Sequence, residues 1–121
     1  MQKNNPDYQK LYTYADGNGN RFVFSWNGFE YFPVTPAISS SGTYDGGTYM
    51  KKVPDSDKYF KVVDLIQKAK ESKEDHTGKR EMMTALINIS EKNVTESEFI
   101  LKAGSKWLTE IETLLKDIRD H

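Results

Sequence analysis

The sequence predicts an α+β domain in which an antiparallel sheet of five or six strands carries two helices packed on one face. Three observations support this prediction. Apolar and polar residues alternate in the first third of the chain, where glycine-rich turns separate the alternating runs. Two later stretches repeat their apolar residues every three or four positions, as amphipathic helices do. Alternation returns between these stretches, which gives the element order β-β-β-(β)-α-β-β-α.

Three strands and two tight turns are expected in the first third of the chain. In RFVFSW, at 21–26, aromatic residues occupy every second position, which is the pattern of a half-buried strand. LYTYA at 11–15 precedes it across the turn DGNGN, and FEYFPV at 29–34 follows it across Asn27-Gly28. An Asn-Gly pair between such runs predicts a hairpin in which both turn residues have positive φ. The prolines in and after FEYFPV end the third strand, because proline has no N–H to donate.

The middle of the chain predicts an edge strand, a helix and a connector. TYMKKV at 48–53 is expected as a short edge strand, and Asp55-Ser56-Asp57 offers the side chains that cap a helix N-terminus. The apolar residues of this helix recur at spacings of three and four: Tyr59, Phe60, Val63, Ile66 and Ala69. The helix is expected to end in ESKEDHTGK at 71–79, a charged connector.

The last third predicts two paired strands and a second helix. REMMTALINIS at 80–90 alternates, with Met83, Ala85, Ile87 and Ile89 on one side and Met82, Thr84, Leu86 and Asn88 on the other. Both sides are partly apolar, so this strand is placed centrally in the sheet. EKNVTE then turns the chain into SEFILKA at 97–103, Gly104 ends that strand, and Ser105 caps the final helix. The wide apolar stripe of this helix comprises Trp107, Leu108, Ile111, Leu114, Leu115 and Ile118.

Length and composition limit the possible classes of protein. The 121 residues predict one domain at 8–121, preceded by a flexible N-terminus at 1–7. There is no cysteine, which excludes disulfides, thiolate catalysis and cysteine-ligated metals. The 17 basic and 18 acidic residues nearly balance, so no net charge favours binding to nucleic acid or a membrane. The sequence as given predicts a cytoplasmic protein, or an exported one if a signal peptide has been removed, and it leaves the oligomeric state open.

The turn DGNGN imitates part of a calcium-binding loop. Asp16, Asn18 and Asn20 occupy the first, third and fifth positions of the EF-hand pattern. That pattern requires glycine at the sixth position and glutamate at the twelfth, where this chain has Arg21 and Asn27. The favoured interpretation is therefore a hairpin turn, and no metal or cofactor is predicted.

The sequence offers no residue that is placed to act as the general base for a serine nucleophile. His76 lies in the charged connector and His121 is the last residue, and neither has a companion at metal-ligand spacing. Ser39, Ser40 and Ser41 are not embedded in the Gly-x-Ser-x-Gly pattern of a nucleophile elbow. The sequence therefore favours a protein without enzymatic activity.

The segment 38–49, ISSSGTYDGGTY, is the candidate functional element. Tyrosine offers a large contact area with little loss of rotamer entropy, while serine and glycine let the backbone conform to a partner. We expect the partner-binding residues to be Ser41, Tyr44, Asp45 and Tyr49. One alternative is an enzyme or small-ligand binder that uses the same loop with Lys51 or Lys52. Another is a plain connection whose tyrosines cover the sheet edge.

Four residues of this loop resemble a known inhibitor motif. Ser41-Gly42-Thr43-Tyr44 is similar to the Ser-Gly-x-Tyr loop of bacterial periplasmic lysozyme inhibitors. The resemblance implies a secreted inhibitor whose loop enters the lysozyme active-site cleft. It covers these four positions only, and the two helices depart from that family's all-β pattern.

The early strands also carry many rings: Tyr12, Tyr14, Phe22, Phe24, Trp26, Phe29 and Tyr31. The favoured interpretation places them in the core beneath the helices, because the chain has few aliphatic residues. The alternative is an exposed platform on which a peptide, sugar or base stacks. Taken together, the sequence favours a small binding module that contacts a protein partner, with dimerisation through an edge strand as a further possibility.

Overall fold

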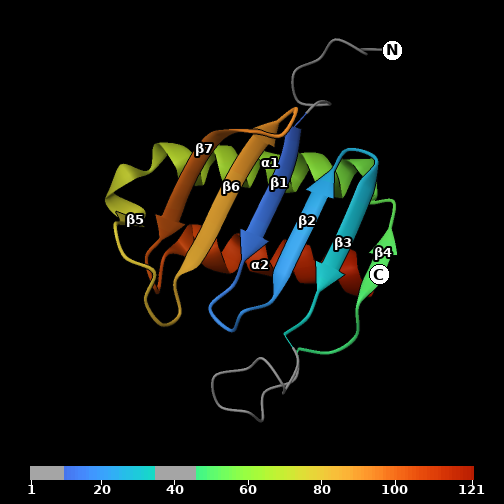
Figure 1. The fold of residues 1–121 in the computed structure, drawn as a ribbon, viewed down its shortest axis with the longest axis horizontal. Helices are drawn as coiled ribbons and strands as arrows, with labels where there is room; N and C mark the ends of the chain where they lie inside the picture. The colour runs from blue at the N-terminus through green and yellow to red at the C-terminus, as the bar shows by residue number, and fades with distance from the viewer. Residues whose placement is uncertain (1–9, 35–45) are drawn as a thin grey trace.

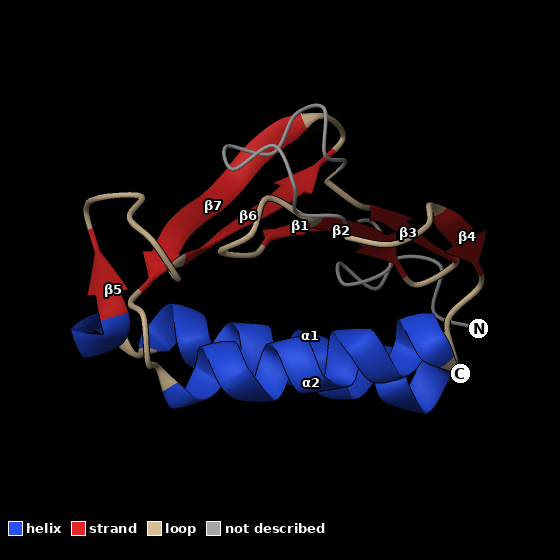
Figure 2. Cartoon of the chain, turned by 90° about the horizontal axis from the view of Figure 1, so that it is seen from below, coloured by secondary structure: helices blue, strands red, loops and turns tan. Residues whose placement is uncertain are grey.

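The computed structural model describes residues 10–34 and 46–121 and arranges them in two layers, a sheet and a pair of helices (Figures 1 and 2). The predicted α+β class is confirmed, whereas the predicted strand number was too low, because the described residues alone form a sheet of seven strands. The proposed flexible N-terminus at 1–7 lies outside the described residues.

Every pair of neighbouring strands in the sheet is antiparallel. The strands are β1 (Lys10–Ala15), β2 (Arg21–Ser25), β3 (Gly28–Phe32), β4 (Met50–Lys52), β5 (His76–Thr77), β6 (Ala85–Glu91) and β7 (Val94–Leu101). Their order is β4-β3-β2-β1-β6-β7-β5, so β1 is the central strand and the two shortest strands form the edges (Figure 1). Short edges limit unwanted pairing with other chains.

The two helices are α1 (Ser56–Glu71) and α2 (Lys106–Asp120), and both lie against the same face of the sheet (Figure 2). Each begins at a predicted cap. The Asp55 carboxylate accepts the N–H groups of Asp57 and Lys58, and the Ser105 hydroxyl accepts the N–H of Trp107. Neither helix has the length and apolar character that crossing a bilayer requires.

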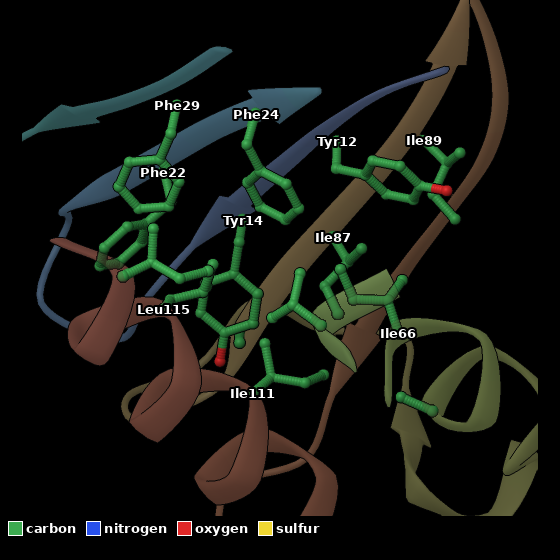
Figure 3. Close-up of a cluster of buried hydrophobic side chains, with 14 of the residues drawn as sticks. Tyr12, Tyr14, Phe22, Phe24, Phe29, Ile66, Ile87, Ile89, Ile111 and Leu115 are labelled. Atoms are coloured by element: carbon green, nitrogen blue, oxygen red, sulfur yellow. The ribbon is translucent and has the colours of Figure 1, made fainter. Parts of the chain in front are cut away.

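The core lies between the helices and the inner face of the sheet. Six of the seven predicted core rings are at most 3% exposed, which confirms their place in the core: Tyr12, Tyr14, Phe22, Phe24, Phe29 and Tyr31. The register sets them opposite one another, with Tyr12 beside Phe24 and Tyr14 beside Phe22. Figure 3 shows five of these rings, all except Tyr31, packed with aliphatic side chains from β6 and both helices. Only Trp26 of the seven is exposed, so the alternative of a ring platform is wrong.

The hairpin between β2 and β3 forms where predicted, but its turn differs. Ser25 pairs with Gly28, so Trp26 and Asn27 are the turn residues and Gly28 begins β3. None of these residues has positive φ, and the Ser25 hydroxyl donates to the Asn27 side-chain oxygen at 2.8 Å. Positive φ at two successive residues occurs instead in the turn between β6 and β7, at Lys92 (52°) and Asn93 (68°).

Two boundaries and one helix face also differ from prediction. Strand β6 begins at Ala85, so Met82 and Met83 are not part of it. Strand β7 begins at Val94, inside the expected turn EKNVTE, and ends at Leu101. The expected connector contains a 3₁₀ helix at Lys73–Asp75 and the added strand β5. On α1 the fully buried stripe includes Val62, whereas Phe60 is 40% exposed, because the rotation of the helix is set by its packing against the sheet and α2.

We expect Leu115→Ala to lower the free energy of unfolding by about 2–5 kcal/mol, because it leaves a cavity in the core. Leu115 is fully buried, whereas its neighbour Leu114 only packs on the edge of the core. Leu114→Ala is the matched control and should have a clearly smaller effect. Urea denaturation measures both, and equal losses would contradict the assignment of the α2 face.

Candidate functional site

Three connections meet at one end of the sheet. These are the turn from β1 to β2, the described ends of the connection from β3 to β4, and the connection from β5 to β6 (Figure 1). The segment 35–45, which contains the expected contact residues Ser41, Tyr44 and Asp45, lies outside the described residues. Tyr49 is described, as are both chain positions between which that segment runs.

The turn from β1 to β2 is built around the carboxylate of Asp16, which is only 5% exposed. One of its oxygens accepts the N–H groups of Asn18 and Asn20, each at 2.9 Å. The other accepts the side-chain amide of Asn20 at 2.9 Å. Both carboxylate oxygens are thus occupied by N–H donors, which supports the interpretation as a hairpin turn rather than a calcium loop.

Asn20 joins this turn to the ends of the undescribed segment. Its side-chain oxygen accepts the N–H of Val34 at 2.9 Å, and the Val34 carbonyl accepts the N–H of Gly46 at 2.9 Å. The Tyr31 hydroxyl donates to the Gly46 carbonyl at 2.5 Å. A side chain at position 46 would collide with Asn20, since a Cβ there would lie 1.9 Å from its amide oxygen. The two ends are therefore held together on a fixed base.

Arg80 joins the same turn to the connection before β6. Its guanidinium donates to the backbone oxygens of Ala15, Asp16 and Thr84, and to the Thr84 hydroxyl at 2.8 Å. One side chain thus crosslinks three backbone carbonyls from two segments that are far apart in sequence. We conclude that this connection is anchored to the end of β1.

The anchored connection presents two methionines to solvent. Met82 is 85% exposed and Met83 is 57% exposed. Met83 has a φ of 65°, which only a few per cent of non-glycine residues adopt. Gly17 packs against it closely, because a Cβ at Gly17 would lie 2.8 Å from the Met83 Cα. The alternating pattern placed both methionines in a strand, so this arrangement could not be predicted from the sequence.

Tyr49 lies on the outer face of the sheet with three neighbours, and we call Arg21, Glu30, Phe32 and Tyr49 the Tyr49 patch. The Tyr49 hydroxyl donates to the Glu30 carboxylate at 2.6 Å, and this hydrogen bond raises the pKa of Tyr49. The Tyr49 and Phe32 rings lie 5.3 Å apart, and the Arg21 guanidinium covers Phe32 at 4.7 Å. Tyr49 remains 47% exposed, so it is held in place and still accessible.

A cavity of about 320 Å³ lies beside the base of the loop, on the side of α2. Arg119 and Asp120 line it, together with Tyr31, Gly46, Gly47, Thr48 and Met50. The Arg119 guanidinium pairs with both oxygens of the Asp120 carboxylate and stacks on the Tyr31 ring at 4.8 Å. Its charge is therefore already compensated, which leaves the cavity poorly suited to bind an ion.

The two lysines of the enzyme alternative do not converge on this cavity. Lys51 is exposed on the edge strand β4, opposite Glu30. The Lys52 ammonium donates to the Ile118 carbonyl at 2.7 Å and so serves the C-terminal end of α2.

The histidines have structural roles or are exposed. His76 was expected in a solvated connector, but its ring stacks on Phe99 at 4.7 Å and contacts the Ala69 carbonyl at 2.8 Å. His121 is exposed and lies 3.8 Å from Asp117. Within the described ranges, no group of three acidic or histidine side chains is arranged to hold a metal ion.

A buried polar pair lies just inside the site, between β1 and α2. The Tyr14 hydroxyl donates to the Glu112 carboxylate at 2.7 Å. Burial raises the pKa of Tyr14 far above its usual range, and the Glu112 carboxylate acts in the same direction. Burial also raises the pKa of Glu112, and the nearby Asp16 adds to this effect. The Tyr14 hydroxyl therefore stays protonated and donates a hydrogen bond to Glu112.

Comparison with known proteins gives no relative: no family model, curated protein or solved structure matches the chain.

We expect Asn20→Ala to lower the free energy of unfolding by about 2–3 kcal/mol, because it leaves the buried N–H of Val34 and an Asp16 oxygen without partners. Asn18→Ala is the matched control. Its side chain is exposed and only its backbone N–H is used, so its effect should stay within about 0.5 kcal/mol. Equal losses in urea denaturation would contradict the role of Asn20 as a clamp.

Glu112 predicts a pH dependence of stability. Because its pKa is raised in the folded state, folding favours the neutral form. This contribution is fully present below the pKa of an unfolded glutamate, about 4.3, and is lost as the pH rises through the folded value. The free energy of unfolding of the wild type relative to Glu112→Gln should therefore fall between pH 4 and pH 8. A difference that is constant or rises over this range would refute the assignment.

Proposed function

We propose that the chain is a small, non-enzymatic binding module that contacts a protein partner through the Tyr49 patch and the adjoining segment 38–48. The observation that carries this proposal is the state of Tyr49, which is half exposed yet fixed by a hydrogen bond to Glu30 and a contact with Phe32. Binding then costs little side-chain entropy, because the ring is already ordered before the partner arrives.

The composition of the Tyr49 patch supports a protein as the partner. Tyrosine and arginine, together with tryptophan, are enriched among the residues that dominate binding energy at protein interfaces. The patch contains both, with Phe32 between them and one acidic residue, Glu30. Charges of both signs around an aromatic centre suit a mixed protein surface better than the uniform negative charge of a nucleic acid.

The hydrogen bonds that join Asn20, Val34 and Gly46 support a contact role for Ser41, Tyr44 and Asp45. The hydrogen bond between Val34 and Gly46 holds together the positions that flank these residues. A segment whose ends are fixed on a rigid base loses less entropy on binding than one attached at a single point. The segment also joins Tyr49 directly, so the two parts can form one continuous surface.

A lysozyme is the first partner to test, because Ser41-Gly42-Thr43-Tyr44 resembles the loop of periplasmic lysozyme inhibitors.

The second candidate function, a small-ligand binder, rests on the cavity lined by Arg119 and Asp120. The paired charges of that cavity favour the first candidate over the second.

The experiment compares affinity purifications from the organism that encodes the chain, with lysozyme as a separate probe. We expect Tyr49→Ala to reduce capture of the specific partner about tenfold, which is typical of losing one central aromatic contact. Tyr44→Ala and Asp45→Ala should weaken capture too. The partner identified by mass spectrometry is then made recombinantly, and its Kd is measured for each variant.

Trp26→Ala is the matched control, because Trp26 is an exposed ring in the hairpin turn at the other end of the sheet. It should leave the Kd within about twofold, since it lies outside the proposed contact surface. Melting temperatures of all variants show whether a loss of binding reflects unfolding. Unchanged binding by Tyr49→Ala, or a loss matched by Trp26→Ala, would reject the Tyr49 patch.

A further inference from the structure

We propose that a groove between α1 and the opposite end of β1 binds a small carboxylic acid with an aromatic tail. The groove has a volume of about 330 Å³. It is lined by Lys10, Tyr12, Phe60, Val63, Asp64, Ile66, Gln67, Lys70 and Ile89. Because β1 separates this groove from the Asp16 turn, the proposal is independent of the Tyr49 patch.

The floor of the groove is apolar and already formed. Tyr12, Ile66 and Ile89 are each at most 3% exposed, and the register sets Tyr12 opposite Ile89. Figure 3 shows Tyr12 and Ile89 at the same end of the core cluster, with Ile66 on the facing helix. This floor belongs to the packed core, so a ligand meets a rigid surface and binding requires little rearrangement.

Phe60 provides an aromatic wall at the rim. Its ring is 40% exposed and packs edge-on against Tyr59, with the ring centres 5.2 Å apart. On an otherwise amphipathic helix, an exposed ring beside an apolar floor leaves contact area that a second ring can cover. Offset or edge-on packing between two aromatic rings adds to the gain from burial.

The charges around the groove leave one cation uncompensated. Asp64 pairs with Lys68 at 3.1 Å, and Lys10 pairs with Glu96 at 3.0 Å. Lys70 is half-buried, and across the described ranges it forms neither an ion pair nor a hydrogen bond. An ammonium without an ion-pair partner gains most from a carboxylate, which accepts its N–H donors and cancels its charge.

The size of the groove limits the ligand. Its volume lies at the lower end of the range for small-molecule sites, so one ring and one short acidic arm fill it. A nucleotide or a polyphosphate would require several free cations, whereas Lys70 is the one basic lining residue without a partner among the described residues. An aryl monocarboxylate matches both the volume and the charge.

The test uses phenylacetate and its uncharged analogue phenylacetamide as probes. The isotope-labelled full chain is titrated with each probe while amide chemical shifts are recorded by NMR. We expect saturable shifts from phenylacetate at residues of α1, β1 and β6 that line the groove. Phenylacetamide should bind about tenfold more weakly, because it lacks the charge that pairs with Lys70.

Lys70→Met should reduce the affinity for phenylacetate about tenfold and abolish its preference over the amide. Lys61→Met is the matched control, because Lys61 is exposed on α1 and does not line the groove. Phe60→Ala removes the aromatic wall at an exposed position and should weaken both probes alike.

Three results would overturn the proposal: no saturable shift with phenylacetate, equal affinities for acid and amide in the wild type, or equal losses in Lys70→Met and Lys61→Met. Each of them leaves the Tyr49 patch untouched, since no residue of that patch lines the groove. Conversely, an inactive Tyr49 patch does not affect the outcome of this titration.

Discussion

The hydrogen-bond network of Asp16 and Asn20 is the constraint on which the architecture of the functional end depends. Asp16 folds its own turn, Asn20 extends the network to Val34 and through it to Gly46, and Arg80 attaches the connection before β6. These residues are distant in sequence but converge on one strand end. A buried hydrogen-bond network stabilises the fold most when each of its polar groups has a partner. No buried side-chain polar atom in the described ranges lacks one.

The network is placed where it is because β1 is the central strand. Its inward rings, Tyr12 and Tyr14, are held by β2 on one side and β6 on the other, with the helices beneath. A strand with two partners and a buried face has little freedom to shift, since a slip of one residue would expose every ring. The turn that follows β1 is therefore held rigidly. The connections that hydrogen-bond to it, before β4 and before β6, are held in place by the same contacts.

Patterns that depend on neighbours in sequence predicted the fold well. Alternation located the strands, and the caps at Asp55 and Ser105 located the helix starts. Features set by distant contacts were not predictable. The Asn27-Gly28 pair indicates a hairpin, but the pairing of Ser25 with Gly28 decides which residues form the turn. Likewise, the clamp of Arg80 on Ala15 and Asp16 cannot be seen in a sequence where these residues lie more than sixty positions apart.

The candidate site was only partly predictable for the same reason. Tyr49 could be identified from composition, whereas its partners Glu30 and Phe32 come from β3, and Glu30 lies 19 positions earlier in the sequence. The groove near Lys70 combines a helix with the start of β1 and had no local signal at all. The Tyr49 patch lies on the outer face of the sheet beside β3 and β4, whereas the groove lies between α1 and the start of β1, with part of the packed core between them. Because such a core transmits little displacement unless it has a second packing arrangement, binding at one surface should leave the affinity of the other unchanged.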